Sequence, residues 1–277
     1  MVSRHTPSTV CTLNTTASLV TNKLTVGGSS ASLDTSPLLY IVDGASLTIG
    51  NEFQVGDSSS KRGRVIQTGG TVVIGGGTYN KLEVGYKSTA GYGGYYTISG
   101  GSISGASAGK LYVGGGGAIG SEGVFTIQGS AATIDVAYLY VGCSSSTGTY
   151  AGSGTIAYEV GASGVTAISA GSVYIDPVAD SASIATLLVS MTSTNPVGDI
   201  LLINNTGTVA VHGVFDTLNG GSAIEGATVV LGGVTYTLTY VYTAGTDGVA
   251  NDVALVAPEP ATIALLSLGL LAIRRKK

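Results

Sequence analysis

The chain has 277 residues, of which 44 are glycine, and only 10% carry a charge, whereas a cytosolic globular domain carries about 25%. Its hydrophobic content of 44% excludes intrinsic disorder, and the abundant Gly, Ser and Thr favour short strands and tight turns. The net charge is −4, and four of the twelve basic residues are the last four of the chain. The rest of the chain is therefore more acidic than the total suggests and offers no basic surface for nucleic acid.

Residues 1–23 show no regular pattern, and we expect an irregular start or an N-terminal cap there. Residues 1–22 contain no apolar run of seven or more residues, so they lack the hydrophobic segment of a secretion signal.

Residues 24–165 contain an internal repeat whose marker is Leu or Phe, any residue, Val and Gly. It occurs at 24–27, 53–56, 82–85, 111–114 and 139–142, so its glycines recur at an almost constant spacing. This period of roughly 29 residues lies within the range of 20 to 50 that is typical of solenoids. A β-propeller or a β-sandwich is the alternative, but propeller blades need about 40–50 residues.

The two apolar positions of each marker are two residues apart, so both face the same side of a strand. If one repeat forms one coil of a parallel β-helix, equivalent side chains stack about 4.7–4.9 Å apart. This predicts two buried ladders, made of Leu24, Phe53, Leu82, Leu111 and Leu139, and of Val26, Val55, Val84, Val113 and Val141. The residues between them, Thr25, Gln54, Glu83, Tyr112 and Tyr140, should face solvent, and the glycine after each Val should form a corner with positive φ.

A second strand recurs at 96–100 and 125–129, and 40–44 and 65–69 are looser versions of it. Tyr96 and Phe125 are expected to stack on the outside, as are Tyr112 and Tyr140. A third short strand follows, for example at 47–49 and 72–74. The sequence therefore predicts an all-β fold, a right-handed parallel β-helix, with handedness set by the crossover rule.

From Val165 onward the period fades, and we expect residues 166–256 to form C-terminal coils and a β cap that closes the core and covers the last strand edges. Strands are predicted at 198–203, 214–215, 226–229, 236–240 and 251–255. This order resembles the C-terminal end of exported bacterial β-helix proteins such as autotransporter passenger-like repeat proteins.

The tail, residues 257–277, has three parts. Pro258, Glu259 and Pro260 come first, thirteen uncharged residues follow, and Arg274, Arg275, Lys276 and Lys277 end the chain. The middle part, which includes Ala261, Leu265, Leu266, Leu268, Leu270, Leu271 and Ile273, favours a short hydrophobic helix that begins after the prolines. It is shorter than the roughly 17–25 residues of a membrane span, so a buried core helix is the alternative. The terminal cations favour a membrane tail with a cytoplasmic basic end.

These three parts in this order resemble the PEP-CTERM sorting signal of Gram-negative bacteria. The resemblance implies export, a transient anchor in the inner membrane, and processing by an exosortase near Pro258-Glu259-Pro260. It also implies association with extracellular polysaccharide and biofilm. Because such a protein should begin with a secretion signal, we expect the given N-terminus to be incomplete.

No catalytic constellation is found. The only histidines are His5 and His212, and no serine elbow has a triad behind it. The acids Asp43, Asp57, Glu83, Glu122 and Asp135 do not repeat in register, and Asp247, Asn251 and Asp252 are better explained as turn residues than as calcium ligands. Cys11 and Cys143 lack metal-ligand spacing, and a disulfide between them is left open.

We therefore predict an exported cell-surface or extracellular-matrix protein with a structural or adhesive role, without enzymatic activity, metal or cofactor. The alternative is a β-helix polysaccharide lyase or hydrolase with its site in the 87–123 loops. Ice or crystal binding through a flat Thr-rich face is a weaker alternative, because the Thr residues show no regular ladder in the sequence.

Overall fold

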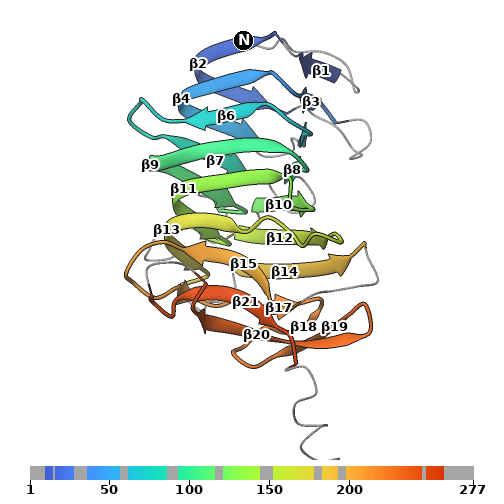
Figure 1. Cartoon of the computed structure of the whole chain (residues 1–277). Helices are drawn as coiled ribbons and strands as arrows, with labels where there is room; N and C mark the ends of the chain where they lie inside the picture. Colours follow the sequence, from blue (N-terminus) through green and yellow to red (C-terminus); the bar gives the residue numbers. More distant parts are fainter. Residues whose placement is uncertain are drawn as a thin grey trace, which may run out of the picture.

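The computed structural model describes residues 10–14, 16–27, 36–56, 62–85, 93–115, 121–143, 152–177, 183–192, 198–244 and 248–258. Every regular element in these ranges is a β-strand. The strands stack along one axis, in sequence order from β2 to β15, and β19, β20 and β21 cover the other end (Figure 1). The prediction of an all-β parallel solenoid is confirmed.

The first sheet forms one side of the solenoid, and its neighbouring strands are parallel until the last pair. Its strands are β1 (Val10–Leu13), β3 (Leu38–Ile41), β5 (Gly63–Gln67), β8 (Gly93–Ile98), β10 (Ser121–Gln128), β12 (Gly152–Val160), β14 (Ile184–Met191), β17 (Thr217–Leu218) and β18 (Gly221–Ser222).

Between successive strands of the first sheet, the chain passes through the second sheet. Its strands before the cap are β2 (Ser18–Val26), β4 (Ser46–Val55), β6 (Thr71–Ile74), β7 (Lys81–Val84), β9 (Gly101–Val113), β11 (Ala132–Val141), β13 (Ile168–Ile175), β15 (Ile200–Asn205) and β16 (His212–Gly213). Each coil contributes two consecutive strand segments to the second sheet. For example, the first half of β4 pairs with β6 and its second half pairs with β7.

The predicted ladder residues pack in the core between the two sheets. Register partners run from Leu24 to Phe53, Leu82, Leu111 and Leu139, and from Val26 to Val55, Val84, Val113 and Val141. Only Leu24 and Val26, in the end coil, reach 8% exposure. Both ladders continue one coil further than the sequence pattern indicated, to Val173 and Ile175.

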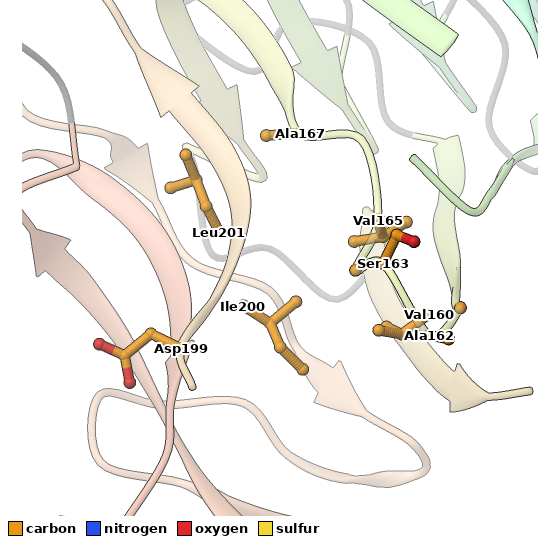
Figure 2. Close-up of a pocket in the computed structure, with 10 residues that line it drawn as sticks. Val160, Ala162, Ser163, Val165, Ala167, Asp199, Ile200 and Leu201 are labelled. Carbon is orange, nitrogen blue, oxygen red and sulfur yellow. The ribbon is translucent and has the colours of Figure 1, made fainter. Parts of the chain in front are cut away.

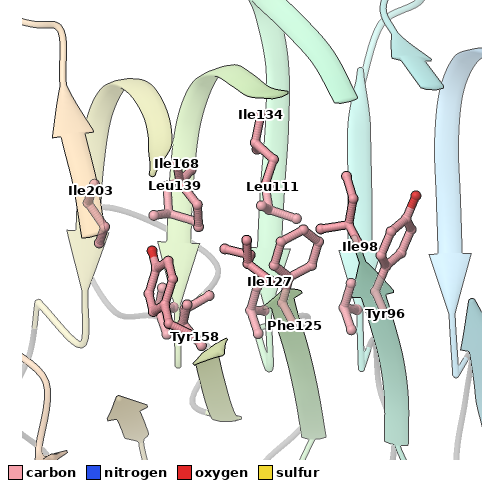
Figure 3. Packing of buried hydrophobic residues seen from close by; sticks show 14 of the residues in the cluster. Tyr96, Ile98, Leu111, Phe125, Ile127, Ile134, Leu139, Tyr158, Ile168 and Ile203 are labelled. Carbon is pink, nitrogen blue, oxygen red and sulfur yellow. The ribbon is translucent and has the colours of Figure 1, made fainter. Parts of the chain in front are cut away.

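Tyr96 and Phe125 belong to this core, so the expectation that they stack on the outside is wrong. Both are 0% exposed, and their rings stack with centroids 5.3 Å apart (Figure 3). Alternation explains their position, because each lies two residues before a buried isoleucine and must share its face. The hydroxyl of Tyr96 is satisfied inside the core, where it donates to Oε1 of Gln67 at 2.6 Å.

The alignment of 40–44 with 65–69 is also wrong by one residue. Leu39 rather than Tyr40 pairs with Val65, and Leu39 is buried while Tyr40 points outward. A one-residue slip exchanges the two faces of a strand, and burial of the apolar face selects the observed register.

The glycines that follow the marker valines form corners with positive φ, as predicted, at Gly56, Gly85, Gly114 and Gly142. They also allow close approach between coils. A Cβ on Gly114 would lie 1.9 Å from the carbonyl oxygen of Ser153 in the next coil. Glycine is therefore required at this corner for both backbone conformation and space.

Antiparallel strands close the C-terminal end of the core. Strand β21 (Asp252–Val256) lies between β15 and β20 (Val234–Tyr242), and β19 (Thr228–Leu231) pairs with β20. Tyr236 and Leu238 of β20 are buried, and so is Phe215. Tyr240 donates its hydroxyl to the carbonyl of Ala223 and accepts from the amide of Phe215, which ties the cap to the last coil.

Candidate functional site

The predicted sorting residues follow the last strand of the cap. Strand β21 ends at Val256, Ala257 is half-buried, and Pro258 is exposed. The other predicted sorting residues, Glu259, Pro260, Arg274, Arg275, Lys276 and Lys277, lie outside the described residues. So do the predicted membrane-segment residues, Ala261, Leu265, Leu266, Leu268, Leu270, Leu271 and Ile273.

Asp199 attaches the start of this tail to the body. It precedes β15, and because β21 runs antiparallel to β15, the beginning of β15 lies beside the end of β21. Oδ1 of Asp199 accepts the amide N–H of Ala257 at 2.8 Å, and Oδ2 accepts the hydroxyl of Tyr242 at 2.9 Å. The hydrogen bond to Asp199 raises the pKa of Tyr242, because a neighbouring carboxylate disfavours the phenolate. We call these three residues the clasp.

Residues 256–277 match the family model described as the PEP-CTERM protein-sorting motif. The chain carries a PEP-CTERM sorting motif. This motif is the recognition signal for exosortase processing, so the protein is exported to the cell envelope or surface. No curated protein and no solved structure matches the chain. Within the part of the chain described, no helix has the length and apolar character needed to cross a membrane.

A pocket of about 460 Å³ lies beside the clasp (Figure 2). It is lined by Val160, Gly161, Ala162, Ser163, Gly164, Val165, Ala167, Asp199, Ile200 and Leu201. Asp199 is the one titratable side chain in this lining, and both its oxygens already accept hydrogen bonds. A glycosidase mechanism needs two carboxyl groups flanking one bond, and this pocket does not bring such a pair together.

The candidate acids that the structure describes form no group that could carry out catalysis or bind calcium. Glu122 accepts from the Tyr95 hydroxyl at 3.2 Å, and Asp252 accepts the amides of Asn205 and Ala244, each at 2.8 Å. Asp57 and Asp247 lie outside the described residues. Across the described ranges, no three His, Cys, Asp or Glu side chains are grouped so that they could hold a metal. Cys11 and Cys143 form no disulfide, and Cys143 is buried beside Tyr112 and Tyr140.

The outer face of the second sheet carries an ion cluster along its first coils. Lys81 contacts Glu83 at 2.7 Å and Glu52 at 3.2 Å, and Lys23 contacts Glu52 at 2.8 Å. Gln54 donates to Glu83 at 2.9 Å. Gln54 and Glu83 were expected to face solvent, but they are 1% and 2% exposed, because neighbouring long side chains cover them.

In this cluster, burial and ion pairing have opposite effects on the pKa values of the two glutamates. Burial raises the pKa of Glu83 and outweighs the opposing effects of Lys81 and Gln54. For Glu52, burial is outweighed by the hydrogen bonds and charges of Lys23 and Lys81, so its pKa is lowered. Glu52 therefore contributes stability at neutral pH that is lost as the pH falls through its lowered pKa. The ionised form of Glu83 costs stability, and protonation at lower pH removes that cost.

We expect Lys81→Met to lower the free energy of unfolding by about 3 kcal/mol at pH 7, because it leaves buried Glu83 without its counter-ion. The deficit relative to wild type should shrink as the pH is lowered from 7, since burial raises the pKa of Glu83 and protonation removes its unpaired charge. Urea unfolding over a series of pH values measures this. Lys23→Met is the control, because the Lys23 side chain is 53% exposed and its pair should contribute less than about 1 kcal/mol. A deficit that grows at low pH would contradict the assignment.

Aromatic rings continue the same outer column. Tyr112 stacks on Tyr140 at 4.6 Å, Tyr140 on Tyr174 at 4.9 Å, and Tyr174 on His212 at 4.8 Å. Tyr112 and Tyr140 stack on the outer face as predicted, but they are only 9% and 8% exposed. Burial, with smaller effects from Tyr174 and Tyr138, raises the pKa of Tyr140 to about 12. Because neighbouring rings cover both faces of Tyr140, this stack stabilises the surface and leaves little open ring face for a ligand.

The outer face of the first sheet differs, because two of its register columns carry no charged side chain between β8 and β17. Register pairing aligns Tyr95, Val124, Thr155, Thr186 and Thr217 in one column and Thr97, Thr126, Ala157 and Leu188 in the next. All nine side chains are half-buried or exposed. We call this set the outer stripe. Its ladder of Thr155, Thr186 and Thr217 was not predicted, because the coils that separate these threonines are longer than the period of the marker repeat.

Sequence reasoning also missed Tyr174, His212 and the clasp. The triplet Val173-Tyr174-Ile175 resembles the Leu-Tyr-Val markers and could have revealed the next coil, although a longer stretch of chain separates it from Leu139. Nothing in the local sequence distinguishes Asp199 or Tyr242 from other loop and strand residues. Their roles arise from the antiparallel pairing of the cap.

Proposed function

We propose that the protein is a structural or adhesive component of the cell surface or extracellular matrix, and that its outer stripe contacts a neutral partner such as extracellular polysaccharide. The observation that carries this proposal is the absence of charge from nine aligned outward side chains, six of which carry a hydroxyl and three of which are aliphatic. Neutral sugars present the same mixture of hydroxyls and apolar C–H faces. The stripe lies on a solenoid that we take to be right-handed, following the crossover rule.

The stripe can be tested by placing charge on it. Thr126→Lys combined with Thr186→Lys should abolish co-sedimentation of the secreted protein with neutral extracellular polysaccharide, because two ammonium groups would have to be desolvated at the contact. Thr48→Lys is the matched control on the outer face of the second sheet and should bind like wild type. Equal binding by all three proteins would remove the stripe from the proposal.

We further propose that residues 261–273 form a short helix that holds the protein transiently in the inner membrane, with Arg274, Arg275, Lys276 and Lys277 on the cytoplasmic side. Support comes from the uncharged segment between the motif and the terminal cations.

Deletion of residues 258–277 should therefore move the protein from the membrane fraction to the soluble exported fraction, which immunoblotting of fractionated cells measures. Glu259→Ala, which keeps the apolar segment and the cations, should stay with the membrane and lose processing. If the deletion variant fractionates like wild type, the anchoring role is wrong.

A further inference from the structure

The folded body and the sorting motif share residues, so no spacer separates them. The motif begins at Val256, which is still part of β21 and pairs with Thr237 of β20. The next residue, Ala257, is tied to Asp199 by its amide N–H. Pro258 is the first exposed residue of the motif.

Little chain remains between the clasp and the apolar segment. Only residues 258–260 separate Ala257 from Ala261, and the four extended steps between these two Cα atoms span at most about 14 Å. The headgroup region on each side of a bilayer is about 5–7 Å thick. If residues 261–273 are inserted, the cap must therefore lie at the membrane surface, with almost no slack around Pro258-Glu259-Pro260.

We propose that Asp199 is a positioning residue for exosortase processing: it closes the clasp and holds Val256 and Ala257 in the cap, so that the enzyme can bind them in an extended form only when the end of β21 frays. This inference rests on the proposed processing of the anchored tail and adds no chemical step to it. A carboxylate that accepts a backbone N–H forms a charge-assisted bond, stronger than a neutral one. The hydroxyl of Tyr242 occupies the other oxygen and holds the carboxylate toward Ala257.

Access of the exosortase to the residues before Pro258 then depends on local opening at the end of β21. Residues at the end of a strand open more readily than the core, and when opening is fast relative to cleavage, the processing rate follows the population of the open form. A clasp that is closed most of the time slows processing. It also makes the processing rate a measure of cap integrity, because a misfolded cap would leave residues 256 and 257 free.

The experiment is a pulse-chase of the full-length protein in exosortase-containing cells. Asp199→Ala should raise the processing rate about tenfold, as expected for loss of an interaction worth about 1.4 kcal/mol. Tyr242→Phe keeps the bond to Ala257 and should raise it less. Four Gly-Ser residues inserted between Ala257 and Pro258 should also accelerate processing, and adding Asp199→Ala to the insertion should give no further increase, because the two changes remove the same restraint.

Asp216→Ala is the matched control. Asp216 also accepts a backbone amide, that of Ala185 at 2.7 Å, but within the solenoid, so this variant should be processed at the wild-type rate. Wild-type rates for Asp199→Ala, or equal acceleration by Asp216→Ala, would overturn the proposal.

Amide hydrogen exchange separates failure of the clasp from failure of processing. The Ala257 amide should lose protection in Asp199→Ala and keep it in Asp216→Ala, whether or not an exosortase acts. If the wild-type chain is not processed at all, the processing function is wrong, and an unprotected wild-type Ala257 amide would show that the clasp itself is wrong.

Discussion

Val84→Asp should prevent the body from folding. Val84 is 1% exposed and lies in the core between its register partners Val55 and Val113. An aspartate there would bury an unpaired carboxylate in an apolar column, which costs several kcal/mol in addition to the lost packing. Since a domain is stable by only about 5–15 kcal/mol, we expect loss of the thermal transition and of exported protein.

Val20→Asp is the matched control for this experiment. Val20 belongs to β2 of the same sheet, but its side chain is 74% exposed, so the new carboxylate remains hydrated. Its melting temperature should stay within a few degrees of wild type. If Val84→Asp melted like Val20→Asp, the two ladders would not be the core of the protein.

Gly114→Ala should destabilise the protein by about 2–5 kcal/mol, the sum of a left-handed backbone strain of about 1–2 and an overpacking cost of about 1–3. Gly114 has φ of 69°, and a Cβ would lie 1.9 Å from the Ser153 carbonyl oxygen and 2.4 Å from the Gly154 nitrogen. These are backbone atoms of the neighbouring coil, so relief requires two coils to separate. Thermal unfolding of the purified body measures the loss.

Gly164→Ala separates the two contributions. Gly164 has φ of 90°, but a Cβ there meets nothing within 4 Å. The variant should therefore lose only the conformational part, about 1–2 kcal/mol. Equal losses at both positions would show that the contact between coils at Gly114 has no energetic role.

The sequence predicted best where neighbouring coils are similar. Leu82 and Leu111 share a ladder because parallel strands in register place equivalent residues side by side, so a constant period in the sequence becomes a column in space. The face of Tyr96 could also have been assigned, because Ile98 lies two residues later on the same strand. Tyr96 lies in the core even though it carries a hydroxyl, because Oε1 of Gln67 accepts a hydrogen bond from that hydroxyl there.

Local sequence patterns did not predict the ladders where the length of the coils changed. The coils between the threonines of the outer stripe and the coil from Leu139 to Val173 are longer than the marker repeat, so neither is visible at its period. The burial of Glu83 could not be predicted from alternation either. Alternation assigns the Glu83 side chain to the outer face. Whether water reaches it depends on the size of the neighbouring side chains, Lys81 and Tyr112.

Two properties follow from the sequence alone: the PEP-CTERM sorting motif, because it is a linear signal, and the parallel solenoid, because its core is built from residues that recur at one period. The tertiary structure decided where the clasp lies and which side chains form the outer stripe. Asp199 and Ala257 are 58 residues apart and meet only because the cap strands pair antiparallel. Contacts of this kind depend on how the chain turns back, and no short segment of the sequence encodes that.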